Sequence, residues 1–245
     1  MRPASPLSAS RAGIAEHVTE PMAERFPDVT MIVFARVPAP GAVKTRLVPA
    51  LGAEGAAELQ RWLLARTIDA ADRVVFGRHE LTLTPVAEPS LLPAAPRARW
   101  ALTVQRGADL GARMHEALER ALNGGGAALL VGSDCPLIDS RYLTTAAYAL
   151  AAGAEVVLGP SDDGGYVLVG LSTPCPEIFE HVPWGTAGVM AATEARLDLA
   201  GRRRGRAFRV EKLPPVFDID EPADLARWRA LEGAQCASGN AAGDS

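Results

Sequence analysis

Short apolar runs alternate along this chain with longer segments whose apolar residues recur at helical spacing. Runs rich in β-forming residues predict buried strands at 30–35, 74–76, 81–86, 102–105, 128–132, 155–158, 166–171 and 207–213. Helical spacing, N-cap residues and glycine stops predict helices at 53–72, 109–123, 140–152, 186–199 and 221–232. Strands that alternate with helices are typical of an α/β fold with a mostly parallel sheet covered on both faces.

The two ends of the chain do not follow this pattern. Residues 1–28 are rich in Ala, Ser, Pro and mixed charge, and residues 233–245 resemble a polar tail, so we expect both to be disordered. No linker divides the part between them. Residues 29–232 are therefore expected to form a single domain, which is within the range for a chain of 245 residues.

Composition narrows the class of protein. The 25 basic and 29 acidic residues give a net charge of −4, without the basic excess expected of a nucleic-acid-binding protein. No run approaches the roughly 18 apolar residues of a membrane span. The three cysteines are far apart and odd in number, which favours reduced thiols and a cytoplasmic location.

A loop rich in proline and cations follows the first predicted strand. Pro38 and Gly41 impose an irregular backbone that can approach a ligand closely, and Lys44 and Arg46 add positive charge. Fixed amides beside cations predict a site for phosphate oxygens. The loop lacks the glycines of a Walker A motif. The alternative is a rigid surface loop whose charges are solvated.

Acidic residues follow two later strands. Asp134 comes directly after the apolar strand 128–132, at the sheet edge where ligands of α/β proteins bind. Asp218 and Asp220 share one side of an extended segment and could serve the same cation as Asp134. Mg²⁺ takes such oxygen ligands together with substrate phosphates. The alternatives are turn caps at Asp134 and a helix cap at Asp220.

A second acidic loop has the sequence Asp162-Asp163-Gly164-Gly165. Its adjacent carboxylates repel each other unless a cation or donor is near, and its glycines leave room for a sugar. The alternative is an ordinary hairpin turn between the strands 155–158 and 166–171.

Two further segments carry polar or aromatic groups suited to a nucleotide or sugar. Gln105 and Asp109 flank the turn at Gly107, and an amide can bind the donors and acceptors of a base edge. Trp184 precedes a predicted helix and could stack on a sugar. The alternatives are a capped turn and a packed helix start. The four histidines are scattered, which argues against catalytic zinc.

In this order, six segments resemble a glycosyltransferase-like family, the formerly uncharacterised DUF2064 group, often labelled an arsenosugar-biosynthesis glycosyltransferase family and similar to the nucleotide-diphospho-sugar transferases. The segments are FARVPAPGAVKTRL, QRGADLGARM, LLVGSDCP, LGPSDDGGYVLVGL, PWGT and FDIDEPADL. Two positions depart from the pattern. Gly132 stands where a D-x-D motif would have its first Asp, and Ala187-Gly188 replaces a charged pair.

The resemblance implies a GT-A-like three-layer α/β/α sandwich, a nucleotide-linked donor, and Mg²⁺ or Mn²⁺ held by Asp134 with Asp218 or Asp220. It implies catalytic roles for Asp163, Asp162 and Lys44. Expected substrate-binding residues are Ala35, Arg36, Pro38, Gly41, Lys44, Arg46, Gln105, Gly107, Asp109, Ser133, Gly164, Gly165 and Trp184.

The main functional hypothesis is a metal-dependent glycosyltransferase that uses a nucleoside diphosphate sugar and a small-molecule acceptor. One alternative is a nucleotidylyltransferase that moves a nucleoside monophosphate from a nucleoside triphosphate to a phosphorylated small molecule. Another is a non-catalytic nucleotide-binding module. The same fold hosts both reactions, so the motifs leave the choice open. We expect a monomer or homodimer.

Overall fold

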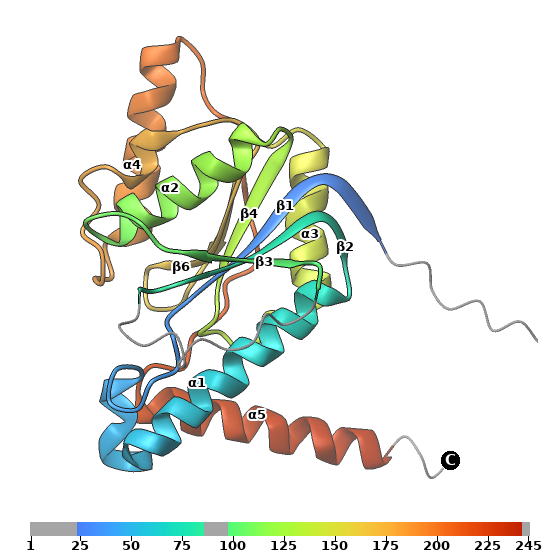
Figure 1. Ribbon diagram of the computed structural model, residues 1–245, viewed down its shortest axis with the longest axis vertical. Coiled ribbons are helices and arrows are strands. Elements are labelled where there is room, and N and C mark those ends of the chain that lie inside the picture. The colour runs from blue at the N-terminus through green and yellow to red at the C-terminus, as the bar shows by residue number, and fades with distance from the viewer. Residues whose placement is uncertain (1–23, 86–97, 242–245) are drawn as a thin grey trace, which may run out of the picture.

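The computed structural model describes residues 24–85 and 98–241, and it confirms the α/β fold (Figure 1). The strands are β1 (Arg25–Ala35), β2 (Val75–Leu83), β3 (Trp100–Val104), β4 (Ala127–Gly132), β5 (Val156–Pro160), β6 (Tyr166–Leu171) and β7 (Val210–Lys212). The helices are α1 (Val48–Asp72), α2 (Leu110–Asn123), α3 (Ser140–Ala151), α4 (Val189–Arg204) and α5 (Pro222–Ala241). Two short 3-10 turns are η1 (Thr45–Leu47) and η3 (Pro176–Phe179).

The described strands form one sheet in the order β3-β2-β1-β4-β6-β5-β7. All neighbouring pairs are parallel except those of β6, which runs antiparallel to both β4 and β5. β1, β4 and β5 therefore end at the same edge of the sheet, where β6 begins. The loops that follow those three strands are the ones that carry most of the predicted chemistry.

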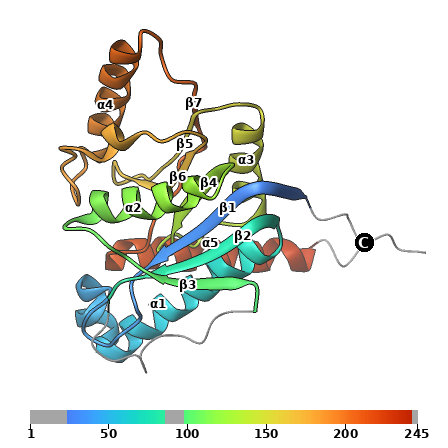
Figure 2. The same cartoon turned by 45° about the horizontal axis from the view of Figure 1, so that its top comes forward.

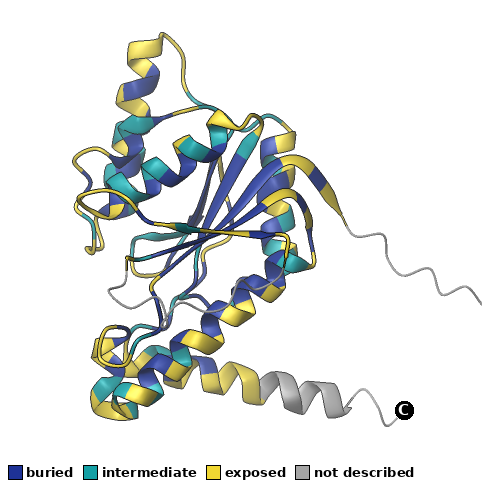
Figure 3. Ribbon diagram, viewed as in Figure 1, coloured by how far each residue is buried: buried dark blue, intermediate teal, exposed yellow. Residues whose placement is uncertain are grey.

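Helices cover both faces of the sheet, and most dark-blue buried positions in Figure 3 lie on the strands and on the sides of helices that face them. Met31 and Val33 of β1 pack in one core with residues of α1 and α3, including Leu64 and Leu143. Ile32 and Phe34, which alternate with them along β1, face a second core formed with α2 and α4. This alternation follows from the two-residue period of a strand.

A third, smaller core joins α1, α5 and the loops that precede these two helices. It contains Leu47, Leu63, Phe217, Ile219, Leu225 and Trp228. Figure 2 shows α5 on the same side of the sheet as α1. Leu47 and Ile219 are completely buried in this core. Their burial fixes the loop of residues 36–47, here called the cationic loop, against the 217–220 segment.

Several predicted boundaries differ from the structure. The two strands predicted at 74–76 and 81–86 are one strand, β2, because parallel pairing with β1 continues through its polar residues. His79 and Glu80 are buried there, and Glu80 is paired with Arg120 at 3.0 Å. β1 includes Arg25–Asp28 and α5 continues to Ala241, both in regions expected to be disordered; residues 1–23 and 242–245 lie outside the described part.

Within the described residues, no helix combines the length and hydropathy needed to cross a membrane. This agrees with the absence of a long apolar run in the sequence.

Glu155 connects the start of β5 to the segment after α4. Its carboxylate accepts hydrogen bonds from Arg204 at 3.0 Å, from Arg206 at 2.6 Å and from the backbone N–H of Arg209 at 3.2 Å. These hydrogen bonds lower the pKa of Glu155 to about 2, and the bond from Arg206 has the largest effect. They outweigh the burial of the carboxylate, which would raise that pKa.

This pairing predicts an acid-sensitive contribution to stability. Because the pKa of Glu155 is lower in the folded protein, its stabilisation is complete above about pH 4.5 and is lost as the pH falls toward 2. Thermal unfolding between pH 7 and pH 3 should show Glu155→Gln less stable than the parent at pH 7, with the gap narrowing toward pH 3. Glu211→Gln, at an exposed position of β7, is the control and should match the parent throughout. A gap that stays constant across this range would contradict the assignment.

Candidate functional site

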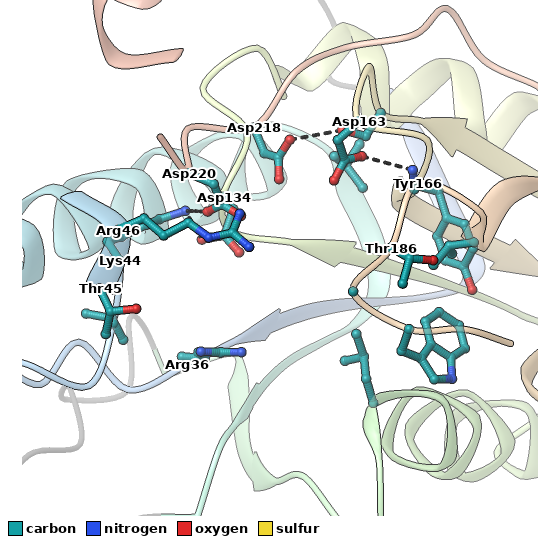
Figure 4. A pocket seen from close by; sticks show the side chains of 18 of the residues that line it. Arg36, Lys44, Thr45, Arg46, Asp134, Asp163, Tyr166, Thr186, Asp218 and Asp220 are labelled. Carbon is teal, nitrogen blue, oxygen red and sulfur yellow. Dashed lines mark hydrogen bonds and ion pairs between the residues drawn. The ribbon is translucent and has the colours of Figure 1, made fainter. Parts of the chain in front are cut away.

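A cleft of about 470 Å³ lies at the sheet edge where β1, β4 and β5 end (Figure 4). Its walls come from the loops after these strands, from the segment before α4, from the start of α2, and from the 218–220 segment before α5. Nine of the predicted site residues line it: Arg36, Lys44, Arg46, Asp134, Asp163, Gly165, Trp184, Asp218 and Asp220.

Lys44 is the central cation of the polar end of this cleft. Its Nζ atom lies 2.8 Å from Oδ1 of Asp134 and 2.8 Å from Oδ1 of Asp220. The lysine side chain is only 3% exposed, whereas the two carboxylates are about half exposed. Burial by itself would lower the pKa of Lys44, but the charges and hydrogen bonds of both aspartates outweigh it and raise that pKa.

The backbone of the cationic loop holds Lys44 in a sparsely populated conformation. Lys44 has φ 47° and ψ 41°, in the left-handed region that costs a non-glycine residue on the order of 1 kcal/mol or more. The loop turns back at Gly41, which has φ 75°, and buried Val43 and Leu47 fix it on either side of the lysine. The two ion pairs and this packing hold the strained residue in place.

Asp218 is a partly buried carboxylate of the cleft. Oγ of Ser161 donates to its Oδ1 at 3.0 Å. Burial, followed by the charges of Asp220 and Asp163, raises the pKa of Asp218 to about 6. The cleft therefore concentrates more negative charge than Lys44 neutralises, and a further cation would be stabilised there.

The carboxylates suit a hard divalent ion. Among the described residues, no three His, Cys, Asp or Glu side chains converge as a complete protein-built metal site. Mg²⁺, however, is commonly bound by one or two carboxylates plus phosphates of the substrate. Asp134 together with Asp218 or Asp220 supplies that number of oxygen ligands at the polar end of the cleft, so the residues fit the ion.

The other end of the cleft is aromatic and apolar. The Trp184 ring stands edge-on to Tyr166, with 6.1 Å between the ring centroids, and Leu110 and Met114 of α2 line the same cleft. Gly111 leaves room for the indole, because a Cβ there would lie 2.4 Å from Nε1 of Trp184. A nucleotide or acceptor would therefore meet charged groups at one end and a flat apolar wall at the other.

The expected base-binding residue is directed elsewhere. Gln105 is buried, and its Nε2 donates to the backbone carbonyl of Ala35 at 3.0 Å. It ties the end of β3 to β1 and does not line the cleft. Ser133 is also fully buried and accepts a hydrogen bond from Gln60 at 3.0 Å. Both side chains are used in supporting hydrogen bonds, and neither lines the cleft as was expected.

The turn before α2 also has a structural role. Asp109 caps the helix by accepting from the backbone N–H of Ala112 at 2.8 Å. Gly107 has φ 144°, and a Cβ at this position would lie 2.7 Å from the carbonyl carbon of Ala112, so only glycine fits. The carbonyl oxygen of Gly107 accepts a hydrogen bond from Nε of Arg113 at 3.1 Å. Neither residue lines the cleft, so the capped-turn alternative describes this segment.

The side chains of the neighbouring residues Asp162 and Asp163 point in different directions. Asp163 lines the cleft and accepts from the backbone N–H of Gly165 at 2.9 Å. Asp162 instead pairs with Arg227 of α5 at 2.8 Å and lies outside the residues that line the cleft. Because successive side chains at this turn point apart, the expected catalytic role of Asp162 is not supported.

Three of the expected binding residues shape loops without lining the cleft. Gly164 packs against the backbone of Ala187, where a Cβ would lie 2.2 Å from the carbonyl oxygen. The Pro38 carbonyl accepts from Arg61 at 3.4 Å, and Gly41 provides the turn described above. These contacts position the loops on which Lys44 and Asp163 are carried.

The expected site residues did not include Gln60, Ser161, Tyr166, Gly185 and Thr186, which all line the cleft, although the last four stand within the quoted segments. Ser161 had a weak signal, because a hydroxyl stands directly before the acidic pair. Gln60 had none, since it lies within a helix far from every motif and reaches the site only through the packing of α1.

Comparisons with known proteins place the chain in a family. Residues 67–186 match the model of a family described as an uncharacterized protein conserved in bacteria (DUF2064). Phosphoenolpyruvate guanylyltransferase from Rubrobacter xylanophilus (strain DSM 9941 / JCM 11954 / NBRC 16129 / PRD-1) is 34% identical over 211 residues, which are 84% of this chain and 97% of the relative. The chain belongs to the DUF2064 family.

Two solved structures share the fold of this chain. A protein from Desulfovibrio desulfuricans G20, classed with the nucleotide-diphospho-sugar transferases, is 30% identical, with a TM-score of 0.71 over 79% of this chain and 83% of that one. Rv0371c from Mycobacterium tuberculosis H37Rv, solved in complex with manganese, has the same fold, with 20% identity and a TM-score of 0.50 over 82% of this chain and 97% of its own. The DUF2064 chain is a transferase of the superfamily that includes nucleotidyl- and nucleotide-sugar transferases.

Cys135 follows Asp134 at the cleft but is not suited to be a nucleophile. It is buried, and burial raises the pKa of its thiol to about 12; burial does the same at Cys175.

In the folded protein at pH 8, iodoacetamide should label Cys135 and Cys175 at least roughly 100-fold more slowly than in guanidinium chloride, because the thiolate is rare and covered. Peptide mass spectrometry measures each site. Labelling of Cys135 at the denatured rate would contradict this.

Proposed function

We propose that this DUF2064 protein is a metal-dependent nucleotidylyltransferase, which transfers a nucleoside monophosphate from a nucleoside triphosphate to a small anionic acceptor. The observation that carries the proposal is the meeting of Lys44 with Asp134 and Asp220 in a cleft whose rim holds Arg36 and Arg46. Cations opposite metal-binding carboxylates are suited to a polyphosphate with its divalent ion.

The cations suit the leaving group of this reaction. An acceptor oxygen attacks the α-phosphorus, the bond from that phosphorus to the oxygen bridging to the β-phosphate breaks, and pyrophosphate leaves with the electron pair. Negative charge grows on the pyrophosphate oxygens. Arg36 makes no hydrogen bond or ion pair with the described residues, and Arg46 has only an exposed pair with Glu221 at 3.3 Å, so both can bind these oxygens. Such fixed cations stabilise the transition state more than the ground state.

Asp134, with Asp218 or Asp220, would hold the divalent ion, which when bound supplies Lewis-acid stabilisation of phosphate charge. The manganese complex of Rv0371c, which has the same fold, supports a divalent ion. A phosphate or carboxylate acceptor is already anionic, so no side chain has to remove a proton. Asp163 lies on the side of the cleft that Trp184 and Thr186 line, where its carboxylate would accept a hydrogen bond from a hydroxyl of the bound nucleotide.

The curated relative supports both the reaction and the first substrates to test. It is a phosphoenolpyruvate guanylyltransferase, and this chain covers nearly its whole length. GTP with phosphoenolpyruvate is therefore the first donor and acceptor pair, followed by ATP, CTP and UTP.

Pyrophosphate release tests the proposal. Purified protein with Mg²⁺ and phosphoenolpyruvate should release pyrophosphate from one of the four nucleoside triphosphates. Asp134→Asn should lower that rate roughly 10³-fold, because the loss of a metal ligand removes several kcal/mol of transition-state stabilisation. Asp198→Asn, which changes an exposed carboxylate of α4, is the matched control and should keep the parent rate. An Asp134→Asn rate equal to the parent rate would refute the assigned role.

Glycosyl transfer is the second candidate, because the D. desulfuricans relative is classed with the nucleotide-diphospho-sugar transferases. In that reaction Asp163 would accept the proton of an acceptor hydroxyl, and a nucleoside diphosphate would leave. Incubation with nucleotide sugars and Mn²⁺ should then release nucleoside diphosphate, with Asp163→Asn at least roughly 100-fold slower because a general base is lost. Pyrophosphate release without nucleoside diphosphate release decides for nucleotidyl transfer.

A further inference from the structure

The position between Asp134 and Asp220 already contains a cation. Nζ of Lys44 lies at hydrogen-bond distance from one oxygen of each, and its side chain is almost completely covered. These are two of the carboxylates that the proposed function assigns to the divalent ion. A metal ion and the ammonium group would therefore compete for the same oxygens.

The other cations of the cleft are differently placed. Arg36 has no partner among the described residues, and the pair of Arg46 with Glu221 is exposed on both sides. They can receive phosphate oxygens without giving up a buried contact. Only Lys44 has to exchange partners before its ammonium can bind a phosphate chain.

We propose that Lys44 occupies the metal position until a polyphosphate draws it away, so that the divalent ion enters together with the phosphate chain and binds poorly alone. The inference rests on the proposed function of the cleft. It assigns Lys44 a role in the order of binding in addition to its contact with phosphate.

Charge balance explains this order. Without substrate, two carboxylates share one ammonium, and a metal ion that displaced it would leave a covered cation without a partner, which is costly. A phosphate chain removes that cost because its oxygens replace both carboxylates as partners of Lys44. The freed carboxylates and the phosphates then form the mixed ligand set that Mg²⁺ prefers.

Metal binding to the nucleotide-free protein tests the competition directly. Titration with Mn²⁺, followed by calorimetry and by the electron paramagnetic resonance of free Mn²⁺, should show Lys44→Met binding at least roughly tenfold more tightly than the parent, because two carboxylates lose their cation. Lys212→Met is the matched control, since Lys212 is the other lysine of the chain, pairs with Glu194 and does not line the cleft. It should bind as the parent does. Equal or weaker binding by Lys44→Met would overturn the proposal.

The parent protein provides a test that does not depend on a variant folding. Because the chain has only two lysines, labelling with ¹³C,¹⁵N-lysine gives two Cε signals in an NMR spectrum, one from Lys44 and one from Lys212. Mg²⁺ alone at millimolar concentration should leave the Lys44 signal in place, whereas Mg²⁺ with inorganic tripolyphosphate should move it and leave Lys212 unchanged. A shift of Lys44 with Mg²⁺ alone, or none with both, would overturn the proposal.

Failure of this inference is distinct from failure of the proposed function. A protein that releases pyrophosphate but binds Mn²⁺ equally with and without Lys44 loses only the binding order. A protein that shows the Lys44 response but releases no pyrophosphate from any nucleoside triphosphate loses only the proposed reaction.

Discussion

The ion pairs of Lys44 with Asp134 and Asp220 bring three distant parts of the chain to one point. The lysine lies in the loop after β1, one aspartate follows β4, and the other precedes α5. Each segment is anchored by apolar neighbours, so the charges meet only where the packing of the sheet and of α5 is complete. The polar end of the cleft depends on this meeting, because it places the ammonium group of Lys44 between the carboxylates of Asp134 and Asp220.

The antiparallel strand β6 shapes the rest of the site. It turns back beside β5, so the loop between them carries Asp163 to the same edge as Asp134. The same turn sends Asp162 outward to Arg227, which stacks on the Phe217 ring at 4.0 Å. One of two adjacent carboxylates thus serves the cleft, while its neighbour secures the loop to α5.

The aromatic end is built by close packing between backbone and ring. Gly111 in α2 accommodates the Trp184 indole, and Gly164 accommodates the segment that follows it. Substituting either glycine would displace a wall of the cleft without touching a charged group. The shape of this end of the cleft is therefore coupled to the packing of α2 and α4 on the sheet.

The sequence alone determined the fold class, the family and the loops in which the chemistry lies, because hydrophobic period and the placement of Gly, Pro and Asp after strands are local properties. It also indicated Lys44, Asp134, Asp163, Asp218 and Asp220 as chemically capable residues. It could not show which capable side chains face the cleft.

Only the tertiary structure decided those directions. Gln105 and Ser133 are buried in supporting hydrogen bonds, Asp162 points away, and Gln60 enters from the middle of a helix. The physical reason is that a side chain's partners are set by packing between segments separated by many residues. The charge of Lys44 could be known from its position in the sequence, but its two partners follow from how the sheet and α5 bring their loops together.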